Sequence, residues 1–156
     1  MVRAFVGLGS NLGDREQTLR RAVERLGELR GTTVRAVSTF RDTAPVGIVD
    51  QPRFLNGAVA LDTALTAREL LAALLEIELA LGRDRSGVAP GGPRTLDLDL
   101  LLYGDAEIDE RGLRVPHPRL AERRFVLEPL IELDPALEAP SHGPLEALLA
   151  KLDSGA

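Results

Sequence analysis

The stretch Gly92-Pro93-Arg94-Thr95-Leu96-Asp97-Leu98-Asp99-Leu100-Leu101-Leu102-Tyr103 contains the pattern around which the fold of this chain is organised. Leucine and aspartate alternate from Leu96 to Leu100, which is the period of a β-strand with leucines on one face and both carboxylates on the other. Side chains two residues apart lie about 6.5 Å apart along a strand, so the two negative charges repel each other unless a cation lies beside them. Because aspartate is also a poor strand former, the pattern favours a strand that binds a hard divalent cation such as magnesium. From this stretch alone, the alternative is a half-exposed strand with its acids in water.

The composition limits the classes of protein to which this chain can belong. The chain has 156 residues, of which 44% are hydrophobic and 28% are charged, so we expect residues 1–156 to form a single globular domain. Its net charge of -5 argues against broad binding to nucleic-acid phosphates. No apolar run approaches the roughly 20 residues that span a membrane, and the first residues lead into a strand rather than a signal peptide. The absence of cysteine excludes disulfides and thiolate metal sites, and it fits a cytoplasmic protein.

The rest of the chain alternates between strand and helix patterns. Capping boxes at Asp14 and Gln17, and at Thr66 and Glu69, each mark the start of a helix. We expect strands at 2–10, 33–41, 54–61 and 96–103, helices at 14–31 and 66–82, loops at 42–53 and 83–93, short helical turns within 119–133 and a last helix at 145–152. The order β-α-β-β-α-β is that of a ferredoxin-like plait. The predicted fold class is therefore α+β, with a mainly antiparallel sheet, two helices on one face and additional C-terminal helices.

Five segments, taken in order, match the motifs of one enzyme family. They are Gly7–Gly13, Gln51–Asn56, Gly92–Asp99, Val115–Pro118 and Phe125. Together they resemble the 6-hydroxymethyl-7,8-dihydropterin pyrophosphokinase (hydroxymethylpterin pyrophosphokinase) family over essentially the whole chain. The resemblance implies a 2-amino-4-hydroxy-6-hydroxymethyldihydropteridine diphosphokinase. Such an enzyme transfers diphosphate from ATP to the hydroxymethyl group of 6-hydroxymethyl-7,8-dihydropterin, giving AMP and the pterin diphosphate in folate biosynthesis.

The resemblance assigns roles at the phosphate end of the site. Asp97 and Asp99 match two aspartates that hold two Mg²⁺ ions together with ATP. With them, Arg83 and Arg94 form the expected catalytic set. The expected ATP-binding residues are Glu78, Arg83, Arg85, Arg94, His117 and Arg123. Since Lys151 is the only lysine, phosphate contacts must come largely from arginine.

Some of these roles have ordinary structural alternatives. Arg83 and Arg85 could instead be solvated cations at the end of a helix, and Glu78 could be a helix-surface residue with no role. His117 could be a surface histidine in a rigid turn. Arg124 beside Arg123 leaves open which of the two faces phosphate.

The resemblance also assigns a pterin pocket. Its expected residues are Thr43, Val46, Phe54, Asn56 and Phe125. Two phenylalanines can stack on a flat heterocycle, and an asparagine can pair with its amide edge. The alternatives are core phenylalanines and an asparagine that serves local backbone.

The glycine-rich turn at the end of the first strand is expected to be structural. Gly7 and Gly9 would let the first helix pack, and Ser10 or Asn11 would brace the pterin pocket, although such turns often bind phosphate elsewhere.

The loop at 83–93 departs from the family pattern. Many members have an aromatic residue directly before Gly-Pro-Arg, where this chain has Pro90 and Gly91. The loop is also one residue longer, with Ser86 at a position that is basic in some relatives, and Arg114 replaces an expected small polar residue. We still expect this loop to be mobile without nucleotide and to close over it.

Two other functions remain open on sequence grounds. One is another magnesium-dependent nucleotidyl or phosphoryl transferase, and the other is a non-catalytic ligand-binding plait domain. For the favoured function the partners are ATP and a reduced pterin, with no nucleic acid and no membrane. We expect a monomer, with a weak homodimer as the alternative.

Overall fold

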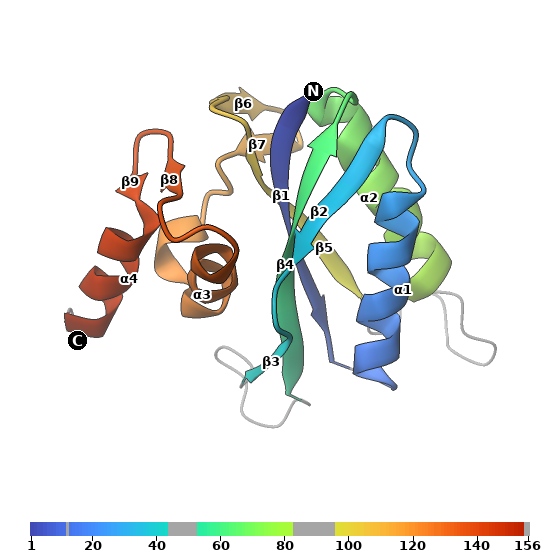
Figure 1. Cartoon of the computed structure of the whole chain (residues 1–156), viewed down its shortest axis with the longest axis horizontal. Coiled ribbons are helices and arrows are strands. Elements are labelled where there is room, and N and C mark those ends of the chain that lie inside the picture. The colour runs from blue at the N-terminus through green and yellow to red at the C-terminus, as the bar shows by residue number, and fades with distance from the viewer. Residues whose placement is uncertain (12, 44–52, 83–95, 155–156) are drawn as a thin grey trace.

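A five-stranded antiparallel sheet lies between two layers of helices (Figure 1). The computed structural model describes residues 1–11, 13–43, 53–82 and 96–154. The elements are β1 (Val2–Ser10), α1 (Arg15–Gly27), β2 (Thr32–Val37), β3 (Arg41–Thr43), β4 (Phe54–Thr63), α2 (Ala67–Gly82), β5 (Asp97–Tyr103), β6 (Ile108–Glu110), β7 (Leu113–Val115), the 3-10 turn η1 (Leu120–Glu122), α3 (Arg124–Leu133), β8 (Glu138–Ala139), β9 (Gly143–Pro144) and α4 (Leu145–Ser154). No helix among these residues is long and apolar enough to cross a membrane.

The sheet has the strand order β2-β4-β1-β5, with β3 also paired to β4. Every pairing between the described strands is antiparallel. Figure 1 shows α1 and α2 on one face of the sheet and α3 and α4 on the other. This arrangement confirms the predicted α+β plait with additional C-terminal helices.

Both predicted capping boxes start helices. The Asp14 side chain accepts a hydrogen bond from the Gln17 backbone N–H at 3.1 Å at the start of α1. Before α2, the Glu69 carboxylate accepts from the Thr66 backbone N–H at 2.9 Å, and the Thr66 hydroxyl accepts from the Glu69 N–H at 3.1 Å. These contacts satisfy backbone donors that have no partner inside the helix.

Several predicted boundaries are wrong. The strand expected at 33–41 is two strands, because Ser38 interrupts it: the Ser38 hydroxyl accepts from the Ala58 N–H at 2.9 Å, in the place of a backbone carbonyl. Asp42 and Thr43 therefore belong to β3 and not to the predicted loop. Helix α1 ends at Gly27, four residues before Gly31. The region 119–133 contains one short turn, η1, as predicted, but the rest of it is the 10-residue helix α3.

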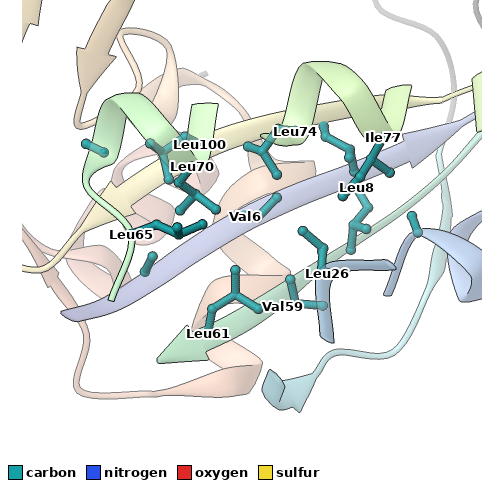
Figure 2. Close-up of a cluster of buried hydrophobic side chains, with 14 of the residues drawn as sticks. Val6, Leu8, Leu26, Val59, Leu61, Leu65, Leu70, Leu74, Ile77 and Leu100 are labelled. Carbon is teal, nitrogen blue, oxygen red and sulfur yellow. The ribbon is translucent and has the colours of Figure 1, made fainter. Parts of the chain in front are cut away.

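Two hydrophobic cores use opposite faces of the sheet. Figure 2 shows the first core, in which Leu70 and Leu74 of α2 pack against strand residues such as Val6 and Leu100. The second core lies under α3 and α4 and includes Leu101 of β5. Alternation along β5 places Leu101 on this second face with the two aspartates, and a register shift between Phe5 and Val6 of β1 brings Leu102 to it as well. In the alternating part of β5, the two aspartates face away from Leu98 and Leu100, toward the side of the sheet that α3 covers.

We predict a large stability difference between two leucines of α2. Leu70 is 0% exposed and Leu75 is 48% exposed. Leu70→Ala should lower the free energy of unfolding by about 2–5 kcal/mol, because it leaves a cavity in the first core. The matched control Leu75→Ala should cost less than about 0.5 kcal/mol. Urea unfolding followed by circular dichroism measures both, and equal losses would contradict the packing described here.

Candidate active site

Seven of the predicted site residues line one cavity of about 290 Å³. The cavity lies on the face of the sheet that α3 covers, and it has both polar and aromatic walls. The predicted residues that line it are Thr43, Phe54, Asn56, Asp97, Asp99, Arg123 and Phe125. They come from β3, β4, β5 and the start of α3, so the fold brings together positions that are far apart in the sequence.

The floor of this cavity is the pairing between β1 and β5. In its register, Gly9 lies opposite Asp97 and Gly7 lies opposite Asp99. Cross-strand neighbours share a face of the sheet, so the two glycines leave open space beside the two carboxylates. A Cβ atom on Gly9 would lie 2.8 Å from Oδ1 of Asn56, and one on Gly7 would lie 3.2 Å from Cδ1 of Leu101. The glycines thus shape the cavity floor, whereas the sequence led us to expect that they let the first helix pack.

The carboxylate pair fits magnesium. Asp97 is half-buried and Asp99 is exposed on the cavity side of β5. Among the described residues there is no cluster of three or more histidine, cysteine or acidic side chains that could enclose a metal ion. Two hard oxygen donors that leave most coordination positions to phosphate and water match the usual magnesium site in phosphate-transferring enzymes.

A second cavity of about 640 Å³ lies beside the first and shares Asp99 with it. His117 lines this second cavity, together with Leu71 of α2 and residues of the β6–β7 hairpin. Arg111 and Arg114 of the hairpin also line it, although neither was predicted as a site residue. The only sequence signal for them is their position just before the Val-Pro-His motif. Asp99 therefore lies where two cavities meet.

His117 is held as a hydrogen-bond donor. Its Nδ1 accepts from the Arg119 backbone N–H at 3.1 Å, which places the proton of the neutral ring on Nε2. Burial lowers the pKa of His117, and the charges of Arg123 and Arg119 lower it further, while Asp99 opposes them. The imidazole is therefore mainly neutral at pH 7, with Nε2–H available to an acceptor.

The structure separates the two neighbouring arginines. Arg123 lines the first cavity, with its guanidinium carbon 5.6 Å from the centroid of the Phe125 ring. Arg124 instead forms ion pairs with Glu128 at 3.6 Å and with Asp153 of α4. Of the two, Arg123 is therefore the cation of the cavity.

Asn56 and Thr43 form the polar part of the first cavity's wall on β3 and β4. Asn56 is buried, and its amide Nδ2 donates to the Thr43 hydroxyl. Thr43 pairs with Phe54 across β3 and β4. This bond orients the amide, whose remaining donor and acceptor capacity suits the edge of a heterocycle.

An ion-pair network joins β3 to the start of α1 and to the residue before β4. The Asp42 carboxylate accepts from Arg15 at 3.2 Å and from Arg53 at 2.8 Å. The hydrogen bonds from Arg15 and then from Arg53 lower the pKa of Asp42. Arg15 also donates to the Arg53 backbone carbonyl at 2.9 Å, so the first residue of α1 links β3 to the residue just before β4.

Glu78 is neither a surface residue nor a lining residue of the two cavities. It is buried on α2, and its carboxylate accepts from the Leu98 backbone N–H at 2.6 Å. The predicted residues Val46, Arg83, Arg85 and Arg94, and the predicted closing loop at 83–93, lie outside the described residues.

We predict that the pKa of His117 lies below the ordinary histidine value of 6.5. Asp99→Asn should lower this pKa further, because it removes the negative charge that favours the imidazolium. Asp105→Asn, in the exposed turn after β5, is the control and should leave it unchanged. NMR titration of the imidazole C–H resonances measures all three, and a rise in pKa on Asp99→Asn would contradict the geometry.

The sequence matches a family model along most of its length. Residues 5–135 match the model of 7,8-dihydro-6-hydroxymethylpterin-pyrophosphokinase (HPPK). A 2-amino-4-hydroxy-6-hydroxymethyldihydropteridine pyrophosphokinase of Bacillus subtilis is 49% identical over 130 residues, covering 83% of this chain and 77% of the relative. The enzyme of the same name from Methylorubrum extorquens is 47% identical over 153 residues, covering 98% of this chain and 95% of the relative.

Solved structures share the fold at low sequence identity. An HPPK-DHPS in complex with substrates matches with a TM-score of 0.76 and 11% identity over 96% of this chain. Wild-type HPPK-DHPS of Plasmodium falciparum matches with a TM-score of 0.69 and 12% identity over 97% of this chain. This chain spans only 43% of the length of each of these proteins, so they bear on the fold alone. The family match and the close relatives place this chain in the 7,8-dihydro-6-hydroxymethylpterin-pyrophosphokinase family.

Proposed function

We propose that this chain transfers diphosphate from ATP to the hydroxymethyl group of 6-hydroxymethyl-7,8-dihydropterin, giving AMP and the pterin diphosphate in folate biosynthesis. The observation that carries the proposal is Asp99, which borders both cavities. One cavity has the two phenylalanines and the buried amide that suit a pterin. The other extends toward His117 and the arginines of the β6–β7 hairpin, which suit a nucleotide.

Two Mg²⁺ ions are proposed to bind at Asp97 and Asp99 together with ATP. When bound, they would neutralise charge on the phosphate oxygens during diphosphate transfer. The two carboxylates would hold these ions beside the first cavity, where Gly7 and Gly9 of β1 place no side chains opposite them.

The phosphate contacts are proposed to come from His117 and Arg123. His117 donates through Nε2, since its Nδ1 already accepts from Arg119. Arg123 supplies positive charge from the start of α3. Arg83, Arg85 and Arg94 are proposed to complete this set on sequence grounds.

The pterin ring is proposed to stack between Phe54 and Phe125, with Asn56 at its amide edge. Thr43 orients the Asn56 amide, and Val46 is proposed from the sequence to complete the apolar wall. Stacking and amide pairing fix both the plane and the rotation of the ring, which would place its hydroxymethyl group for in-line attack.

We further propose that residues 1–156 form one catalytic domain that acts as a monomer. A cytoplasmic location stays a prediction of the sequence.

Product analysis with ATP, magnesium and the hydroxymethyl pterin tests the proposed function. The expected products are AMP and a diphosphorylated pterin in equal amounts. Release of inorganic pyrophosphate would instead indicate a nucleotidyltransferase. Pterin binding without any turnover would indicate a non-catalytic domain.

We predict that Asp97→Ala and Asp99→Ala each lower kcat/KM by at least about 100-fold. Loss of a group that holds a phosphate-bound cation should remove about 3 kcal/mol of transition-state stabilisation. Asp105→Ala removes an exposed carboxylate just after β5 and serves as the matched control, with activity near that of the wild type. Near-normal activity of either site variant at saturating magnesium would contradict the assignment.

We predict that Gly9→Ala weakens pterin binding about tenfold while leaving the KM for ATP unchanged. Its Cβ would lie 2.8 Å from Oδ1 of Asn56 and would displace the amide, at the cost of about one hydrogen bond. Gly27→Ala is the control, because its Cβ would meet Val34 at an ordinary 3.6 Å. Steady-state kinetics with each substrate varied in turn measure the effect, and an unchanged pterin KM would refute it.

A further inference from the structure

A buried carboxylate lies directly behind the strand that carries the two aspartates. Glu78 belongs to the last part of α2 and is only 8% exposed. Its Oε2 accepts a hydrogen bond from the Leu98 backbone N–H at 2.6 Å. Leu98 is the residue between Asp97 and Asp99, so this contact holds the backbone midway between the two carboxylates.

The position of Leu98 at the edge of the sheet makes this contact necessary. β5 pairs with β1 on one side and is an edge strand of the described sheet. Every second N–H of an edge strand points away from its neighbour and needs another partner. A carboxylate is a strong acceptor for such a group, because charge-assisted hydrogen bonds are about twice as strong as neutral ones.

Packing alone does not explain an acid at this position. The residues of α2 that precede it on the sheet side, Leu74 and Ile77, are apolar and fill the first core (Figure 2). A carboxylate that is buried without hydrogen bonds is costly, whereas a leucine would fill the same space at no such cost. The bond to Leu98 is a contact that a hydrophobic residue at this position could not make.

We propose that Glu78 is a positioning residue for Asp97 and Asp99, acting through the Leu98 backbone. The inference rests on the proposed function, and it replaces the direct contact with ATP that the resemblance implies for this residue. Magnesium needs near-ideal octahedral geometry, so the two carboxylates must be held closely in place. Glu78 ties the edge strand to α2 at the point where mutual repulsion of the aspartates would otherwise displace it.

The test compares two substitutions that differ in hydrogen bonding. Glu78→Gln keeps an acceptor oxygen that Leu98 can use, whereas Glu78→Leu keeps the volume and removes the acceptor. Glu76→Leu, on the exposed side of α2, is the matched control. Thermal melting establishes that each variant is folded, and Glu78→Ala substitutes for Glu78→Leu where the leucine variant fails to fold.

The first readout needs no substrate. In the ligand-free protein, the Leu98 amide should exchange with solvent at least about tenfold faster in Glu78→Leu than in the wild type, because one buried hydrogen bond is lost. Glu78→Gln and Glu76→Leu should keep it protected. Unchanged protection of Leu98 in Glu78→Leu would overturn the proposal, and it would do so even if the chain had no pyrophosphokinase activity.

The second readout concerns the metal. Binding of Mn²⁺ in the presence of a non-hydrolysable ATP analogue, followed by electron paramagnetic resonance, should weaken at least about tenfold in Glu78→Leu. The kcat should fall by a similar factor with the pterin KM unchanged, and Glu78→Gln should recover most of both losses. Equal loss in Glu78→Gln and Glu78→Leu would overturn the proposal, because it would make the charge of Glu78 and not its acceptor oxygen the important property. Failure of the wild type to form AMP would refute the proposed function. The exchange rate of the Leu98 amide would still test the role of Glu78 in that case.

Discussion

The antiparallel pairing of β1 with β5 is the constraint on which the site depends. Two aspartates on one face of a strand need both open space and a compensating cation. Gly7 and Gly9 lie opposite them on β1 and supply the space. A side chain at Gly9 would also collide with Asn56, which lies opposite Gly9 in the pairing of β1 with β4, so the same glycine leaves room for the amide. The cation that we propose is Mg²⁺ bound together with ATP.

The two helical layers of the fold have different roles on the two faces of β5. The α2 layer packs on the leucine face of β5 and ties its backbone through Glu78. The α3 layer lies over the aspartate face, where Arg123 and Phe125 enter the cavity at its start. One strand thus contributes to the core with one face and to the site with the other. Asp99, on the site face, borders both cavities.

Short-range patterns in the sequence were enough to predict most of the fold. Strict alternation from Leu96 to Leu100 and two capping boxes identified β5 and the starts of α1 and α2. Features that depend on distant partners were missed. Ser38 ends β2 because its hydroxyl bonds to Ala58, and Glu78 is buried because Leu98 lies beside it. The choice between Arg123 and Arg124 likewise depends on Asp153, 29 residues further along the chain. A local pattern cannot contain such information, because each outcome is decided by tertiary contacts.

The most direct measurement of the central proposal is an anomalous difference map from crystals grown with Mn²⁺, a non-hydrolysable ATP analogue and the hydroxymethyl pterin. We expect two manganese peaks beside the first cavity, both coordinated by oxygens of Asp97 and Asp99 and by phosphate. The pterin should lie on the side of Phe54 and Phe125, and the nucleotide on the side of His117. Manganese bound to phosphate alone, with both aspartates uncoordinated, would contradict it.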